Sequence, residues 1–129
     1  MGNTDKKAMI LAVDDSAANL QLIKGLLSGE FDVRYAKSGE MALAALIKLR
    51  PDIILLDIEM PDMSGFEVMN EIVKDSGLKN IPVIFVTSHA TEELVTKAIR
   101  HGAADYIVKP FDADVLRAKV QNILKKTKS

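Results

Sequence analysis

Polar side chains follow four apolar runs of this 129-residue chain, each at the point where the run ends. Three are carboxylates, one is a hydroxyl and one is an ammonium; in chain order they are Asp14, Asp15, Asp57, Thr87 and Lys109. The carboxyl ends of parallel strands meet at one edge of a sheet, where open α/β sheets bind ligands. Carboxylate oxygens suit Mg²⁺, and an ammonium and a hydroxyl can hold a phosphoryl group. These residues therefore predict a site for a divalent cation and a phosphoryl group.

Five short segments are expected to be the strands that position this site. Residues 8–13, 53–56 and 83–86 are continuous apolar runs, which are typical of strands covered on both faces. Residues 31–36 alternate apolar and polar side chains, and residues 104–108 are less apolar, so both suit the edges of a sheet. The three apolar runs are therefore expected at the centre of one sheet.

Helical patterns separate these strands, and each pattern follows a side chain that can accept a hydrogen bond from the helix N-terminus. The predicted caps are Ser16, Ser38, Ser64, Thr91 and Asp112. In the helix after Ser38, the spacing predicts a buried face that carries Met41, Leu43, Ala44 and Leu46. Strand and helix alternate five times, which predicts an α/β fold with a doubly wound, five-stranded parallel sheet and five helices.

The composition favours one globular domain and disfavours several classes of protein. Hydrophobic residues make up 48% and charged residues 27%, and the formal charge of −1 gives no general attraction to nucleic acid or to an anionic membrane. There is no cysteine, so disulfides and thiolate metal sites are excluded. No apolar run approaches the roughly 20 residues of a membrane span. We expect a cytoplasmic protein with no direct nucleic-acid or membrane contacts.

The chain is expected to divide into three unequal parts. We predict a flexible N-terminal segment over residues 1–7, one domain over residues 8–125 and a C-terminal tail over residues 126–129. The residues leave open whether the chain acts alone or is cut from a longer protein.

Five motifs at the predicted strand ends and helix starts resemble those of the receiver domain of bacterial two-component response regulators. They are Val13-Asp14-Asp15-Ser16, Leu55-Leu56-Asp57-Ile58-Glu59-Met60-Pro61, Ser64-Gly65, Val86-Thr87-Ser88 and Val108-Lys109-Pro110-Phe111. Each motif alone is a weak signal, whereas all five in this order are specific. The resemblance covers residues 8–125 and implies the flavodoxin-like receiver fold with strand order 2-1-3-4-5.

The resemblance implies a role for each polar residue of the predicted site. Asp57 is the expected phosphoacceptor, which attacks the phosphorus of a phosphohistidine on a sensor histidine kinase. Asp15, Asp57 and the backbone carbonyl of Glu59 are the expected direct ligands of Mg²⁺, with Asp14 acting through water. Lys109 is expected to pair with Asp57 at rest and with a phosphoryl oxygen afterwards. In this interpretation the domain is a phosphoacceptor rather than an enzyme with its own substrate.

The resemblance also implies a conformational switch. Thr87 and Tyr106 match the switch positions, and phosphorylation is expected to bias a two-state equilibrium in the face formed by the fourth helix, the fifth strand and the fifth helix. That face would contact a partner protein or an output domain, and the same face leaves a monomer and a phosphorylation-linked dimer both open. A cis peptide bond before Pro110 is implied as well.

Two side chains beside the predicted site are particular to this chain. Glu59 lies two residues after Asp57, and His89 lies two residues after Thr87. We hypothesise that they approach each other over the phosphorylation site and that, while His89 is protonated, they shield it from water and slow hydrolysis. If His89→Ala left the dephosphorylation rate the same as that of the wild type between pH 6 and pH 8, this hypothesis would be contradicted.

Other functions stay open on the residues alone. A receiver can relay its phosphoryl group to a histidine phosphotransfer protein. A Mg²⁺-dependent phosphatase with an aspartyl nucleophile also has an acid two residues after the nucleophile, as in Asp57-Ile58-Glu59, but there the nucleophile follows the first strand and a cap covers the substrate. A flavin-binding fold is disfavoured because the acidic loop after the first strand is a poor cradle for phosphate.

Overall fold

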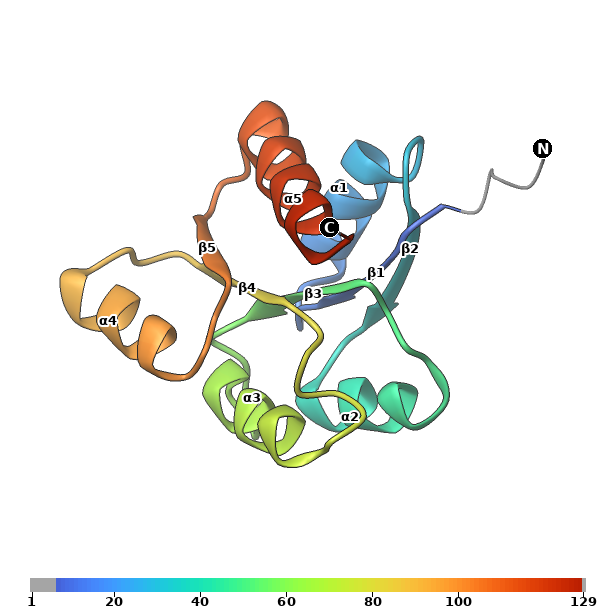
Figure 1. The fold of residues 1–129 in the computed structure, drawn as a ribbon. Helices are drawn as coiled ribbons and strands as arrows, with labels where there is room; N and C mark the ends of the chain where they lie inside the picture. The colour runs from blue at the N-terminus through green and yellow to red at the C-terminus, as the bar shows by residue number, and fades with distance from the viewer. Residues whose placement is uncertain (1–6, 129) are drawn as a thin grey trace.

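The computed structural model describes the backbone of residues 7–128 and contains five strands and five helices in strict alternation (Figure 1). The elements are β1 (Met9–Val13), α1 (Ala17–Leu27), β2 (Asp32–Ala36), α2 (Gly39–Lys48), β3 (Ile53–Asp57), α3 (Gly65–Lys74), β4 (Val83–Thr87), α4 (Glu92–Arg100), β5 (Asp105–Val108) and α5 (Ala113–Lys128).

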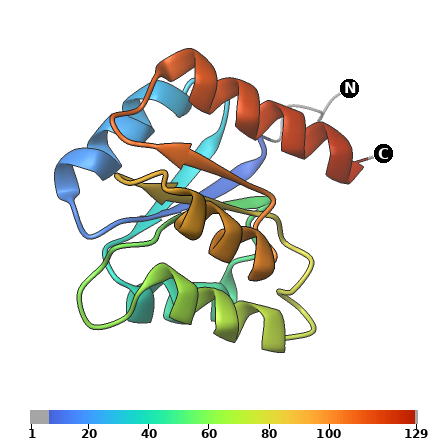
Figure 2. The same cartoon turned by 90° about the vertical axis from the view of Figure 1, so that its left-hand side faces the viewer.

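The five strands form one parallel sheet in the order β2-β1-β3-β4-β5, so the predicted fold class and strand order are confirmed. Helices α1 and α5 cover one face of the sheet, and α2, α3 and α4 cover the other (Figures 1 and 2). Strand β1 lies between β2 and β3, and the chain crosses from β2 over β1 to reach β3. The loops after β1 and β3 therefore leave the sheet side by side, which is where open α/β sheets bind ligands.

The core consists of two clusters, one on each face of the sheet. Successive strand residues alternate between the clusters: Leu11 and Ile54 belong to the α2–α3–α4 side, and Ile10 and Ile53 belong to the α1–α5 side. Because both faces are covered, β3 and β4 are buried along their whole length. This explains why their sequences are continuous apolar runs rather than alternating ones.

The predicted helix caps are confirmed. The side chains of Ser16, Ser38, Ser64 and Thr91 each accept a hydrogen bond from the backbone N–H three residues later. The Asp112 carboxylate accepts bonds from the first N–H groups of α5. These bonds satisfy N–H groups that have no partner within the helix.

The buried face of α2 agrees with the prediction at Leu43 and Leu46 and differs from it at Met41 and Ala44. Met41 is 53% exposed and Ala44 is exposed, whereas Gly39, Ala42 and Leu46 face the core. The reason is the close approach of α2 to α3, where a Cβ atom at Gly39 would lie 2.8 Å from Val68 Cγ2. This contact sets the rotation of the helix about its axis, and it is not visible in the periodicity of α2 itself.

The ends of the chain differ in how far the structure describes them. Helix α5 extends to Lys128, so it includes residues 126–128 of the predicted tail. Residues 1–6 of the predicted flexible segment and residue 129 lie outside the described residues. Among the helices of residues 7–128, none has the length and apolar character needed to cross a bilayer.

Candidate functional site

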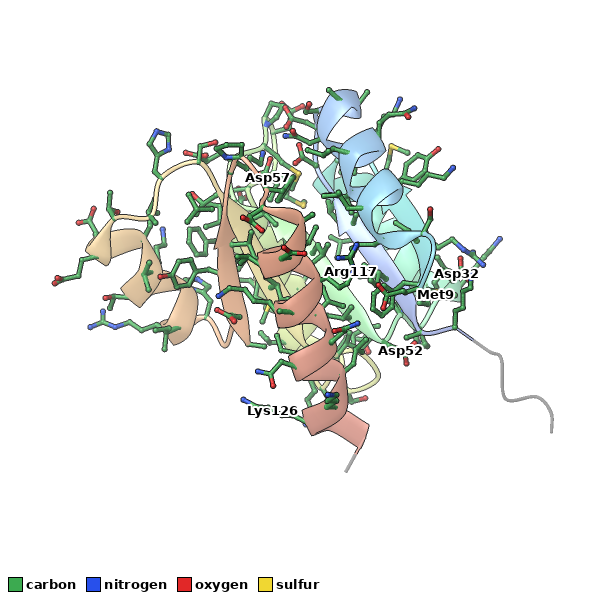
Figure 3. All side chains as sticks on the ribbon, turned by 90° about the horizontal axis from the view of Figure 1, so that it is seen from above. Met9, Asp32, Asp52, Asp57, Arg117 and Lys126 are labelled. Atoms are coloured by element: carbon green, nitrogen blue, oxygen red, sulfur yellow. The ribbon has the colours of Figure 1, made fainter. Side chains whose placement is uncertain are left out.

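Three aspartates converge at the carboxyl edge of the sheet. Asp14 and Asp15 follow β1, Asp57 ends β3, and the pairing of Val13 with Leu56 places the two strand ends side by side. One carboxylate oxygen from each aspartate lies within 4.8 Å of the others. Asp14 and Asp57 are each only 1% exposed, whereas Asp15 is exposed. Figure 3 places Asp57 at the opposite end of the sheet from Met9 and Asp52.

Lys109 brings a positive charge into this cluster. Its Nζ atom lies 3.1 Å from Asp14 Oδ2 and 3.4 Å from Asp57 Oδ2. The backbone N–H of Lys109 donates to the carbonyl of Thr87, which ties the loop after β5 to the end of β4. The peptide bond between Lys109 and Pro110 is cis, as the resemblance implied. The ammonium is therefore shared between two buried carboxylates.

The protonation of the site follows from burial and charge. Burial is the largest cause that raises the pKa of Asp57, and the neighbouring charge of Asp14 raises it as well. Lys109 and the Glu59 N–H only partly offset these effects, so that the resulting pKa is about 6. Burial alone would lower the pKa of Lys109, but attraction to Asp57 and Asp14 outweighs it, so that pKa is raised. At neutral pH three carboxylates face one ammonium, and a divalent cation would balance the excess negative charge.

The arrangement fits a divalent cation bound by oxygen. The three carboxylates supply hard ligands from two adjacent loops, and one of them, Asp15, is open to solvent. The carboxylate oxygens of Asp14 and of Asp57 all have protein donors, and the exposed Asp15 is the carboxylate most open to an ion.

The two predicted switch residues lie on neighbouring strands. Thr87 is buried at the end of β4, and its hydroxyl donates to the carbonyl of His89 at 3.1 Å and accepts from the His89 N–H at 3.0 Å. Tyr106 on β5 is half-buried against the α2–α3–α4 cluster, with Lys119 Nζ 5.3 Å from its ring centre. The Thr87 hydroxyl is thus bound within its own loop in this structure.

Glu59 and His89 meet, as hypothesised. The Nδ1 atom of His89 lies 2.9 Å from Glu59 Oε2, and the two side chains are 65% and 46% exposed, respectively. The pair joins the loop after β3 to the loop after β4. Its effect on hydrolysis stays a prediction.

Two features of the segment after β3 were not predicted from the sequence. Gly65 begins α3 so close to β3 that a Cβ atom there would collide with the Asp57 carbonyl oxygen and lie 2.9 Å from Ile58 Cα. Asp62, in the turn before α3, has a φ of +67°, a conformation that Asp adopts more readily than most residues. No spacing in the sequence indicates that Gly65 contacts the backbone of Asp57.

A third missed contact joins α3 to α4. The ring of Phe66 packs edge-on against Phe85 with centres 5.1 Å apart and lies 4.8 Å from the ring of His101. Lys97 Nζ lies 4.4 Å from the centre of the Phe66 ring, close enough for a cation–π interaction. No spacing within either helix predicts this cluster, because Phe66 lies 19 to 35 positions before its three partners.

A parallel α/β sheet with three aspartates and a lysine at its carboxyl edge defines a class of phosphoacceptor signalling domains. The family described as the response regulator receiver domain matches residues 10–121. The chain therefore belongs to this family and is a phosphoacceptor receiver domain of two-component signalling.

Known proteins agree with this assignment. The chain is 38% identical over 120 residues to a probable cyclic di-GMP phosphodiesterase of Vibrio cholerae, covering 93% of this chain and 27% of that protein. It is 38% identical over 117 residues to the response regulator PleD of Caulobacter vibrioides, covering 90% of this chain and 26% of that protein. The chain thus spans about a quarter of these curated relatives.

A solved structure matches almost the whole domain. The chemotaxis response regulator CheY4 of Vibrio cholerae superposes with a TM-score of 0.86 at 33% identity, covering 92% of this chain and 99% of CheY4.

Proposed function

We propose that Asp57 is the phosphoacceptor of this receiver domain. The observation that supports this most directly is the geometry around its carboxylate, which is buried, beside Asp14 and Asp15, and 3.4 Å from the Lys109 ammonium. The Asp57 oxygen attacks the phosphorus of a phosphohistidine, the phosphorus–nitrogen bond breaks, and the imidazole leaves with its electron pair and takes a proton. The product is an acyl phosphate on Asp57.

Lys109 is proposed to hold the transferred group. Its ammonium is already placed between two carboxylates and can turn from Asp57 Oδ2 to a phosphoryl oxygen over a short distance. Such a donor neutralises charge on the transferred phosphoryl group without moving far, which is how phosphoryl transfer is assisted when little covalent help is needed.

The ion of this site is proposed to be Mg²⁺. In this proposal Asp15, Asp57 and the backbone carbonyl of Glu59 would hold it directly, and Asp14 would act through water, as the resemblance implies. When bound, the ion supplies positive charge to phosphoryl oxygens. The excess of negative charge at the site supports this proposal.

The proposed output is a change in the face formed by α4, β5 and α5. Thr87 would turn its hydroxyl from His89 to the phosphoryl group, and Tyr106 would follow. This face already exposes apolar side chains, among them Ile99, Val108 and Val115. It would contact a partner protein, an output domain or, as a phosphorylation-linked dimer, a second copy. The proposed donor is a sensor histidine kinase, and the proposed location is the cytoplasm.

The first experiment is phosphorylation by acetyl phosphate in the presence of Mg²⁺, followed by intact mass. We expect one phosphoryl group on the wild type and on Asp62→Asn, a matched control in the same loop, and none on Asp57→Asn or without Mg²⁺. An adduct on Asp57→Asn would contradict the assignment.

Steady hydrolysis of a generic phosphate ester would instead favour the aspartyl phosphatase. Transfer from the labelled domain to a histidine phosphotransfer protein would favour a relay.

A further inference from the structure

Asp14 is held by three protein donors. The backbone N–H of Ser16 donates to Asp14 Oδ1 at 2.9 Å, and the Asn19 amide donates to Asp14 Oδ2 at 3.3 Å. The Lys109 ammonium contacts the same Oδ2 at 3.1 Å. Since Asp14 is 1% exposed, water cannot replace a lost donor without a rearrangement.

The start of α1 differs from the start of α3 in a way that bears on this site. In α3 the cap Ser64 and the third helical residue, Glu67, exchange hydrogen bonds, so that the glutamate accepts the cap's N–H. In α1 the cap's N–H goes to Asp14, and the third residue is Asn19, which also donates to Asp14. A glutamate at position 19 would add a fourth negative charge to the cluster, whereas the amide adds a donor and no charge.

We propose that Asn19 is a positioning residue for phosphoryl transfer, a role that rests on the proposed function of Asp57. Asp14 Oδ2 accepts one hydrogen bond from the Asn19 amide and a second contact from the Lys109 ammonium. Lys109 is thereby shared with Asp57, at 3.1 Å and 3.4 Å, respectively. Without the amide, Oδ2 has Lys109 as its one donor, and the ammonium moves toward Asp14 and away from the carboxylate that receives the phosphoryl group.

The test compares the rate of phosphorylation by acetyl phosphate at saturating Mg²⁺ in Asn19→Ala and Asn19→Asp. We expect Asn19→Ala to be about 3–10-fold slower and Asn19→Asp to be slower still, because a carboxylate repels Asp14 where the amide attracted it. Gln21→Ala, an exposed change in the same helix, is the control and should match the wild type. The affinity for Mg²⁺ of Asn19→Ala, measured by calorimetry, should stay within about twofold of the wild type.

Thermal unfolding without Mg²⁺ separates positioning from a structural role in α1. In Asn19→Asp the favourable interaction of an acid with the helix dipole opposes the repulsion from Asp14, so this variant should melt close to Asn19→Ala although it reacts more slowly. Rates that follow the melting temperatures, or equal rates in Asn19→Ala and the wild type, would overturn the proposal while leaving the role of Asp57 intact. Absence of an adduct in the wild type would overturn the proposed function, and this inference with it.

Discussion

At the scale of single residues, the buried carboxylate of Asp57 is the group with the largest electrostatic cost. Its pKa in the folded protein is raised to about 6 by burial and by Asp14, against 3.8 for an ordinary aspartate. Between these two pKa values, the folded protein keeps the Asp57 proton whereas the unfolded chain has released it. The stability that this proton contributes is complete below about pH 4 and is lost as the pH rises through about 6.

A pH-dependent difference in stability follows from this shift. Without divalent cations, Asp57→Asn should gain unfolding free energy relative to the wild type as the pH rises from 5 to 7, by about 1 kcal/mol. Urea denaturation of both proteins in the presence of a chelator at the two pH values measures the difference. A constant difference between the proteins would show that Asp57 is not the group that titrates.

The Glu59–His89 pair predicts a slower loss of the phosphoryl group. The two side chains join the loop after β3 to the loop after β4, and in our hypothesis they shield the phosphorylated Asp57 from water. His89→Ala should therefore dephosphorylate about 2–10-fold faster than the wild type, because hydrolysis needs water to reach the acyl phosphate. The decay of the phosphorylated protein, followed by intact mass, gives the rate. Gln21→Ala, an exposed change in α1, is the control and should leave the rate unchanged.

At the scale of elements, the start of α3 fixes the end of β3. Gly65 is the point of closest approach, and a side chain there would push against the Asp57 backbone. Gly65→Ala should lower the unfolding free energy by about 1–3 kcal/mol and slow phosphorylation at least about tenfold, because a small displacement of a reacting group costs much of its rate.

Gly25 is the control for this substitution. It lies within α1, and a Cβ atom there would have no neighbour within 4 Å. Gly25→Ala should raise stability by about 0.5–1 kcal/mol, because alanine is the better helix former. Urea denaturation and the acetyl phosphate assay measure both variants. Equal stability changes of the same sign would contradict the close contact at Gly65.

The elements themselves could largely be predicted from the sequence, because the signals that define them are local. A hydroxyl followed by an apolar helical pattern marks the start of a helix, and a continuous apolar run marks a covered strand, as at Ser16 and in residues 53–56. The rotation of α2 could not be predicted, because it depends on the contact of Gly39 with Val68 in another helix. The spacing of apolar residues in a helix shows which of them share a face, but it does not show which way that face points. Met41 is apolar and yet exposed.

At the scale of the whole molecule, the parallel strands bring site residues as far apart in sequence as Asp14 and Lys109 to the carboxyl edge of the sheet. This gathering could be predicted, since topology alone brings the ends of parallel strands together. The sharing of Lys109 between two aspartates and the amide of Asn19 could not, because both depend on side-chain directions that no spacing records.

The folding equilibrium of the whole domain should respond to Mg²⁺. An ion that binds only the folded state at ten times its Kd adds about 1.4 kcal/mol, which raises the Tm of a domain of this size by about 4–6 °C. We expect this rise at pH 7 in the wild type and its loss in Asp15→Asn, whose carboxylate is the exposed member of the cluster. Scanning calorimetry with and without Mg²⁺ measures it. An undiminished rise in Asp15→Asn would place the ion elsewhere.

The segment after Asp57 touches the segment after Thr87 at two separate places. Glu59 meets His89 before α4 begins, and Phe66 is enclosed by Lys97 and His101 where α4 ends. Ala98 is the one residue of α4 that is fully buried, and Leu94 is half-buried against the same core cluster. Because these contacts hold the C-terminal end of α4, a displacement of its N-terminal end rotates the helix rather than shifting it along its axis. A shift of the Thr87 loop is therefore expected to swing α4 about His101, with the largest travel at Glu92 and Glu93 and the smallest beside Phe66.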